Sequence, residues 1–147
     1  MSNNEERTDL PANFDELKKS INRTANWRER LDAVEELGMW KARETIELLK
    51  HSMAGDSVFK VREAAYRQLL ALGEKVTMPE RKEGDAIKDT KKILVRIKKS
   101  LPKDHSYEDF KEKLKKMRID VYDTYEGEKG ADFDKWLEQL WSELRTS

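Results

Sequence analysis

Two stretches of this 147-residue chain carry the same pattern of apolar residues, one helical hairpin apart. The first runs from Trp27 to Leu37 and the second from Val61 to Leu72; in both, Arg follows the first residue and Gly follows the last. The offset of 34 to 35 residues is typical of stacked helical hairpins. One such hairpin cannot bury its apolar face alone, so a neighbouring hairpin must cover it. The repeat therefore predicts a stack of helices that offers an extended surface instead of a deep reaction pocket.

Apolar residues recur at the three- and four-residue spacing of an amphipathic helix through most of the chain. The segments with this spacing are residues 13–22, 26–38, 42–53, 58–72, 85–100, 107–117 and 133–144. No segment combines the alternating pattern of a strand with flanking turn residues. The predicted fold class is therefore all-α. The remaining long segment, residues 119–131, contains Gly127 and Gly130 and is predicted as a loop.

The order of these segments predicts three parts. Residues 1–12 are expected to form a disordered N-terminal tail, and residues 13–78 to hold the helical repeats. Residues 74–84 contain a proline and a glycine among mixed charges and are expected to form the longest connection. Residues 79–147 are then predicted as a C-terminal helical segment of about three helices that packs on the repeats or caps them.

The second repeated stretch resembles the HEAT repeat, whose second helix often begins with Asp, continues with Val-Arg, and then carries Ala and Leu at helical spacing. The residues that carry the resemblance are Asp56, Val61, Arg62, Ala64, Ala65, Leu69, Leu72 and Gly73. The first stretch matches in part, with Trp27 where Val is usual. Over residues 13–75 the resemblance implies a short HEAT-like α-α superhelix of about two hairpins. It also implies that Asp56 and Arg62 are structural residues that tie adjacent repeats together.

Composition narrows the class of protein. The chain has no cysteine, which excludes disulfides, a thiol nucleophile and a cysteine zinc site, and is compatible with a reducing compartment. A charged content of 41% beside 37% apolar residues suits amphipathic helices with one buried face. No apolar run approaches the roughly 18 residues that a membrane span needs, and residues 1–10 lack the features of a signal peptide. We expect a cytoplasmic protein without membrane contact.

Residues suited to catalysis or metal binding are sparse. The two histidines, His51 and His105, lie near predicted helix ends, and neither has a second histidine at helical spacing. The acidic residues of the 120–128 segment lack the alternating ligands of a calcium loop. The sequence therefore predicts a protein that is not an enzyme, with no catalytic residue, cofactor or metal. Because some HEAT-like proteins are base-excising DNA glycosylases, a DNA-repair enzyme is a further alternative.

A turn between two predicted helices gives the candidate site for a protein partner. Trp40, Lys41 and Arg43 lie there, and tryptophan and arginine are enriched among residues that dominate binding energy at interfaces. The other tryptophans lie on apolar stripes and are expected in the core: Trp27, Trp136 and Trp141. The main hypothesis is a helical-repeat scaffold that mediates protein–protein interaction through this turn. Two repeats are fewer than a stable array usually has, so a homodimer is one way to cap the stack.

Charge is unevenly distributed, which supplies the alternative hypothesis. Residues 88–118 carry twelve Lys or Arg against five Asp or Glu, whereas residues 119–147 carry three against eight. If two basic helices form a hairpin, their outer faces could attract the phosphate backbone of nucleic acid. The residues expected to make these contacts are Lys91, Lys92, Lys99, Lys115 and Lys116. In the competing interpretation, the lysines solubilise the helices or pair with the acidic segment that follows.

Overall fold

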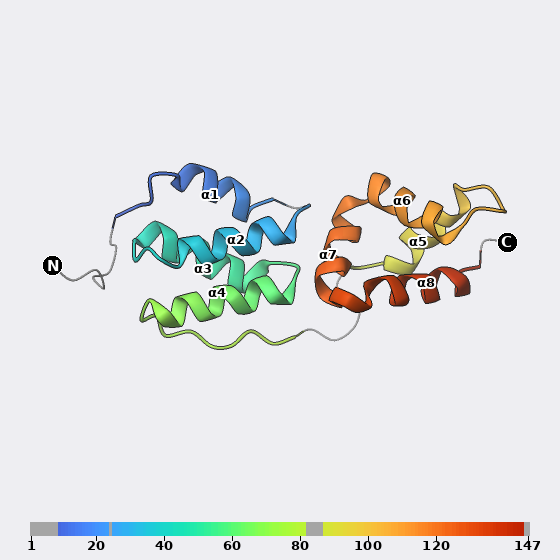
Figure 1. The fold of residues 1–147 in the computed structure, drawn as a ribbon. Coiled ribbons are helices and arrows are strands. Elements are labelled where there is room, and N and C mark those ends of the chain that lie inside the picture. Colours follow the sequence, from blue (N-terminus) through green and yellow to red (C-terminus); the bar gives the residue numbers. More distant parts are fainter. Residues whose placement is uncertain (1–8, 24, 82–86, 146–147) are drawn as a thin grey trace. The chain divides into compact units, whose positions relative to one another are not determined.

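The computed structural model describes residues 9–23, 25–81 and 87–145, and within them every regular element is helical (Figure 1). The prediction of an all-α fold is confirmed. The chain divides into two compact units, Met1–Arg81 and Lys82–Ser147. This division lies within the connection expected at residues 74–84. Each unit has its own buried core, so each is described by itself below.

The N-terminal unit consists of two helical hairpins. Its helices are α1 (Phe14–Ile21), α2 (Trp27–Leu37), α3 (Arg43–Gly55) and α4 (Phe59–Ala71). Helix α1 packs on α2, α3 packs on α4, and the two hairpins meet mainly where α2 packs on α4 (Figure 1). These two helices are the two repeated stretches of the sequence. The periodic pattern therefore predicted correctly which segments lie side by side.

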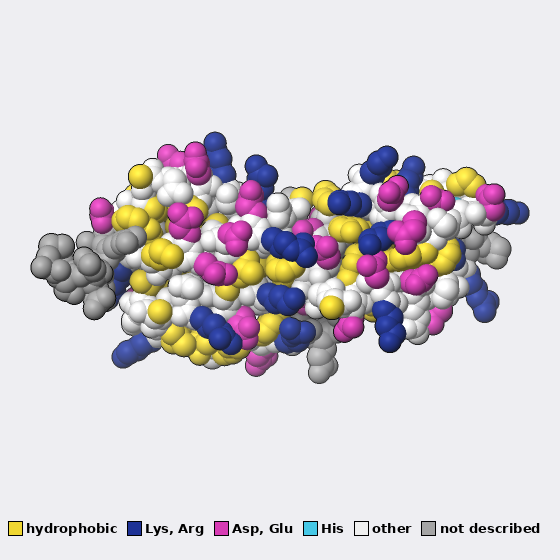
Figure 2. All heavy atoms as spheres, viewed as in Figure 1, with side chains coloured by type: hydrophobic (Ala, Val, Ile, Leu, Met, Phe, Trp, Pro, Cys, Tyr) yellow, Lys and Arg dark blue, Asp and Glu magenta, His cyan; other side chains and the backbone are white. Residues whose placement is uncertain are grey.

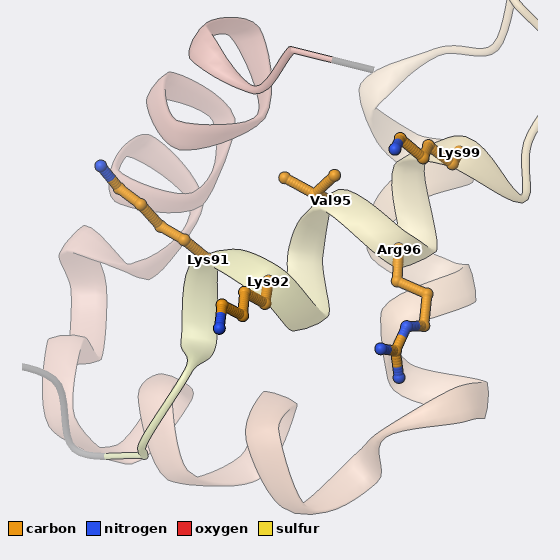
Figure 3. Close-up of a pocket in the computed structure, with 5 residues that line it drawn as sticks. All are labelled: Lys91, Lys92, Val95, Arg96 and Lys99. Carbon is orange, nitrogen blue, oxygen red and sulfur yellow. The ribbon is translucent and has the colours of Figure 1, made fainter. Parts of the chain in front are cut away.

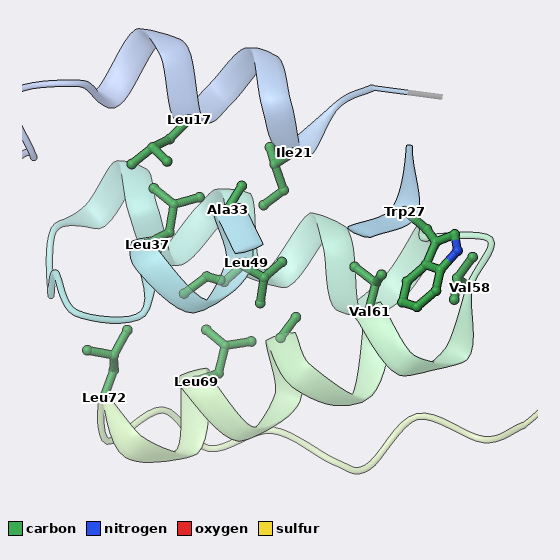
Figure 4. Close-up of a cluster of buried hydrophobic side chains, with 12 residues drawn as sticks. Leu17, Ile21, Trp27, Ala33, Leu37, Leu49, Val58, Val61, Leu69 and Leu72 are labelled. Atoms are coloured by element: carbon green, nitrogen blue, oxygen red, sulfur yellow. The ribbon is translucent and has the colours of Figure 1, made fainter. Parts of the chain in front are cut away.

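The core of the N-terminal unit is almost entirely aliphatic (Figure 4). Its fully buried side chains are Val34, Leu37, Leu49, Val58, Val61, Ala65 and Leu69. Trp27 joins them at the start of α2, with 7% of its surface exposed. Helix α4 ends where Gly73 adopts a φ of 88°, which lets the amide of Glu74 donate to the carbonyl of Leu69 over 2.9 Å. Glycine tolerates this left-handed conformation, and such a cap satisfies carbonyls at the helix end.

A buried ion pair ties the two hairpins together. Arg30 on α2 donates from Nε and Nη2 to the two carboxylate oxygens of Asp56, over 2.9 and 3.2 Å. Both side chains are about 95% buried, with exposed fractions of 5% and 4%. The amide of Val58 donates to the same carboxylate over 2.9 Å, and Arg30 also donates to the carbonyl of Arg23. Asp56 thus has the tying role that the HEAT resemblance implies, with Arg30 as its partner.

Arg62, the other residue implied to tie the hairpins, instead contacts the extended segment 74–81. Its Nη1 lies 3.4 Å from the carbonyl oxygen of Glu80, and its guanidinium lies 5.3 Å from the ring centroid of Phe59. Arg81 covers the same ring at 4.6 Å. In Figures 1 and 4 this segment runs along α4 on the side away from α2. Since Glu80 and Arg81 contact α4, the N-terminal unit extends past the expected boundary at residue 78.

The C-terminal unit has one helix more than expected. Its elements are α5 (Thr90–Lys99), α6 (Tyr107–Met117), α7 (Ile119–Lys129), the 3-10 turn η1 (Gly130–Asp132) and α8 (Phe133–Glu143). Among the described residues the unit therefore has four α-helices, and the prediction of about three was wrong. The prediction of a loop over 119–131 was also wrong, because most of that segment forms α7.

The buried positions of α7 explain why its sequence did not look helical. They are Val121, Asp123, Thr124, Tyr125 and Gly127. These positions point to several sides of the helix, so no single apolar stripe is present for a periodicity argument to detect. The 3-10 turn and Gly130, which has a φ of 58°, then lead directly into α8.

Two other predicted boundaries change. The helix expected over 85–100 begins at Thr90; residues 85–86 lie outside the described part of the chain. Asp89 has a left-handed φ of 61°, and the Thr90 hydroxyl donates to the carbonyl of Ile87 over 2.6 Å, so the turn before α5 is not helical. Of the tail expected at 1–12, residues 1–8 lie outside the described part, and Pro11 is buried.

The core of the C-terminal unit is rich in aromatic rings. Its buried side chains are Leu94, Ile97, Tyr107, Phe110, Leu114, Val121, Tyr125, Phe133 and Leu137. Trp136 and Trp141, both half-buried, pack against this cluster, as expected of core tryptophans. The rings of Tyr125 and Trp136 are stacked with their centroids 4.7 Å apart. Hydrogen bonds from aromatic groups join the helices: the hydroxyls of Tyr125 and Thr90 are 2.6 Å apart, and Trp141 Nε1 donates to His105 Nε2 over 2.9 Å.

Candidate functional sites

One side of α5 forms a positively charged surface. Thr90, Leu94 and Ile97 are buried against the core, which turns the opposite side of the helix outward. The outward residues recur at i, i+1, i+4, i+5 and i+8, the spacing of a helix face. Together they line a hollow of about 390 Å³: Lys91, Lys92, Val95, Arg96 and Lys99 (Figure 3). We call the four charged members of this set, Lys91, Lys92, Arg96 and Lys99, the α5 basic face.

The α5 basic face carries no compensating acid. Its four side chains are exposed, and the described residues that line the hollow include no Asp or Glu. Within the described ranges, none of the four is joined to a carboxylate by an ion pair. In Figure 3 the side chains of Lys92 and Arg96 extend to the same side of the helix. Four positive charges thus lie within about 12 Å along the helix axis, at a rise of about 1.5 Å per residue.

Other basic residues of the 88–118 segment are committed inside the unit. Lys98 Nζ donates to the carbonyls of Trp141 and Leu144 over 2.5 and 3.0 Å. It thereby binds the C-terminal end of α8, where the helix dipole favours a cation. Lys111 pairs with Asp134 at 2.6 Å. The basic segment is therefore neutralised in part by the acidic segment, as the competing interpretation expects.

The two α6 lysines named from the sequence do not line the hollow on α5. Lys115 Nζ lies over the ring of Tyr122, 5.4 Å from its centroid, and Lys116 is exposed near the end of α6. Arg96, by contrast, belongs to the hollow and was not among the residues chosen from the sequence. Its position four residues after Lys92 was the signal that would have identified it.

Asp134 lies at the centre of a small polar cluster that joins α6 to α8. It accepts hydrogen bonds from Lys111 Nζ over 2.6 Å and from the hydroxyl of Tyr107 over 2.9 Å. The bonds from Lys111 and Tyr107 hold the pKa of the Asp134 carboxyl below its usual range. Burial raises the pKa of the Tyr107 hydroxyl, and the hydrogen bond to Asp134 raises it further. At neutral pH the cluster is therefore a structural tie with fixed protonation states.

A second hollow lies on α1 and has a different character. It measures about 560 Å³ and is lined by Asp15, Lys18, Lys19 and Asn22. An acid therefore accompanies its two lysines. On the face of the N-terminal unit that Figure 2 shows, basic and acidic side chains are similarly interspersed. Mixed charge of this kind is common on solvated surfaces, which sets the α5 basic face apart.

The turn between α2 and α3 holds the residues predicted to bind a protein partner. Trp40 and Lys41 are half-buried, whereas the side chain of Arg43 is 88% exposed. The turn is fixed by Thr45, whose hydroxyl donates to the carbonyl of Trp40 over 2.7 Å and accepts from the amide of Ala42 over 3.1 Å. The structure thus brings the three predicted residues onto one well-ordered turn.

Met39 extends this turn and was not identified from the sequence. It is 61% exposed, the largest fraction among the exposed large apolar side chains of the described residues. Its position directly after Gly38, where α2 has ended, was the available signal. An exposed methionine beside a half-exposed tryptophan and two cations is a suitable surface for a protein contact.

No chemical site emerges at the histidines or at the acidic segment. His51 is exposed, and His105 is held between the carbonyl of Pro102 and the indole of Trp141. Asp120, one of the acidic residues considered for calcium, pairs with Arg118 at 3.0 Å. A search of the described residues finds no group of three or more side chains placed to hold a metal ion. The same residues contain no helix with the length and apolar character to cross a membrane.

Comparison with known proteins adds no relationship to this geometry. No family model, no curated protein and no solved structure matches the chain.

Proposed function

We propose that this protein is a non-enzymatic helical scaffold that binds another protein through the α2–α3 turn, here defined as residues 38–43. The supporting observation is the exposure of Met39 and Arg43 beside Trp40 on a turn fixed by Thr45. A preformed surface loses little conformational entropy on binding, so a few side chains can supply most of the affinity. The HEAT resemblance, the lack of cysteine and the absence of a membrane-spanning helix among the described residues agree with a cytoplasmic scaffold.

A quantitative pull-down tests this proposal. The bait is the full chain, and the variant carries Met39→Glu together with Arg43→Glu, two exposed positions that leave the core intact. The matched control carries Lys18→Glu and Lys19→Glu in the hollow on α1. We expect the turn variant, and not the control, to lose the proteins that the unaltered chain enriches. Equal enrichment by all three baits would remove the turn as a binding surface.

Trp40 needs a separate variant because it is half-buried. Trp40→Ala removes a large apolar contact surface, and circular dichroism establishes whether the helices remain intact. If the folded variant still retains every partner, Trp40 has no binding role. If it loses the same partners as the Met39→Glu, Arg43→Glu variant, the three side chains act as one surface.

Phosphate-backbone binding is a second candidate function, supported by the α5 basic face. Four cations without an acidic neighbour in the hollow create a local positive potential that attracts polyanions. Such binding weakens linearly as the logarithm of the salt concentration rises, because counterions are released from the nucleic acid. Absence of binding to any nucleic acid at low salt would exclude this function.

A further inference from the structure

We infer that the α5 basic face alone, without the α6 lysines, binds duplex nucleic acid through its phosphates. The inference rests on the second candidate function above, and it specifies the helix and the ligand. It differs from the expectation from sequence in two residues on α6 that are excluded and one on α5 that is added.

Geometry confines the surface to α5. The hollow is lined by α5 residues, and the outward row on this helix runs from Lys91 to Lys99. On α6, Lys111 is used by Asp134 and Lys115 by the ring of Tyr122. Drawing those lysines onto a phosphate would break contacts that already hold the unit together. The α5 cations have no such contact to lose.

The ligand is a duplex because the α5 basic face carries charge and lacks aromatic rings. Proteins that hold single strands stack bases on exposed aromatic side chains. Here Val95 is the uncharged member of the lining, and the rings of Tyr107, Tyr125 and Trp141 belong to the core of the unit. Phosphate contacts must then supply the affinity. A duplex presents one negative charge per about 1.7 Å of its axis, a higher density than a single strand presents.

An anionic membrane surface is a poorer match. Helices that lie on membranes insert an apolar face between the lipid headgroups. The apolar face of α5 is buried in the protein, with Leu94 and Ile97 at 0% and 1% exposure. Val95, which is half-buried, does not supply an equivalent face. The α5 basic face can therefore approach a charged surface without inserting into it.

The test measures fluorescence anisotropy of the full chain with a random-sequence DNA duplex of two helical turns and with a single strand of equal length. We expect tighter binding to the duplex at low salt. The slope of log affinity against log salt should be no steeper than about −3.6, the value for four neutralised phosphates at about 0.9 each.

Two matched pairs of substitutions locate the surface. Lys92→Gln with Arg96→Gln should flatten the salt slope by about 2, because each lost phosphate contact reduces it by about 1. Lys115→Gln with Lys116→Gln removes the same charge from the same unit and should leave the slope unchanged. Lys91→Gln with Lys99→Gln provides a second α5 variant, and circular dichroism checks the fold of each.

The possible failures are distinguishable. Equal losses from the α5 and α6 pairs, or tighter binding to the single strand, would overturn the inference while leaving phosphate binding in place. Tighter binding to vesicles of phosphatidylserine than to the duplex would also overturn it. No binding to duplex or single strand at low salt would remove the second candidate function itself. None of these outcomes bears on the α2–α3 turn.

Discussion

The two units hold their helices together by different means. In the N-terminal unit the core is aliphatic, and one buried ion pair between Arg30 and Asp56 joins the hairpins. In the C-terminal unit the core is aromatic, and the helices are joined by hydrogen bonds at the polar edges of rings, such as that between Tyr125 and Thr90. Aliphatic packing depends on repeated spacing, whereas an aromatic hydroxyl or indole needs one specific partner. The first arrangement is consequently visible in the sequence, and the second is not.

Removing one partner of the buried ion pair should have the largest effect on this comparison. Asp56→Ala leaves the Arg30 guanidinium charged and buried, and such changes cost about 3–5 kcal/mol in free energy of unfolding. Hydrogen exchange read by mass spectrometry should show faster exchange in peptides of the N-terminal unit.

A double variant separates the lost pair from the stranded charge. Arg30→Met with Asp56→Leu replaces both charges by apolar groups, and exchange of hairpin ions for well-packed apolar residues is often neutral or stabilising. We expect this variant to recover most of the loss. If Asp56→Ala leaves exchange in the N-terminal unit unchanged, the ion pair does not hold the hairpins.

An intermediate effect is expected in the C-terminal unit for Tyr125→Phe. The change deletes the hydroxyl that lies 2.6 Å from Thr90 Oγ1 and 3.3 Å from the amide nitrogen of Ile87, and keeps the stacked ring. Losing a buried hydrogen bond costs about 1–2 kcal/mol. Urea unfolding followed by tryptophan fluorescence measures the change, with Tyr66→Phe in the N-terminal unit as the control. A cost equal to that of the control would show that the hydroxyl contributes nothing.

The smallest effect is expected for Asp134→Asn. The pKa of Asp134 lies below its usual value, so the carboxylate stabilises the folded state above the unfolded pKa of about 3.9. That contribution is lost as the pH falls through the folded pKa. Because the side chain is 62% exposed, solvent screens the pair and the effect should stay below about 1 kcal/mol at neutral pH.

Two measurements check this cluster. The variant should lose slightly less stability than the unaltered chain on acidification below about pH 4, where the carboxylate would be protonated. Tyr107 should also ionise at a lower pH in Asp134→Asn, since the hydrogen bond and charge of Asp134 raise the pKa of its hydroxyl. Ultraviolet absorbance during alkaline titration follows that ionisation. An unchanged Tyr107 titration would mean that the cluster is not formed in solution.

Sequence alone identified the helical stack and missed one helix. The α2 and α4 stretches bury one stripe each, so their spacing was sufficient to predict their packing. Helix α7 is buried on several sides, including at Asp123 and Gly127, and its polar residues gave the impression of a loop. The partner of Asp56 was equally hidden, because Arg30 lies 26 residues earlier in the sequence. No local spacing encodes such a contact.

For the candidate sites, the sequence predicted residue types better than their grouping. It selected Lys91, Lys92 and Lys99 correctly as outward on one helix, because charge and helical spacing agree there. It treated Lys115 as equivalent, although a ring from α7 lies under that side chain. The difference depends on which neighbour packs against each helix. That information appears only once the helices are assembled.

The extended segment after Gly73 sets a limit on what the N-terminal unit can become. Superhelical arrays lengthen by adding a further hairpin onto the exposed flank of the last one. Here the chain itself returns along α4, with Val76 against the core and Arg81 over the Phe59 ring. That flank is occupied by a strip with no helix of its own. The design is thus one of fixed length: a two-hairpin module that terminates its own growth.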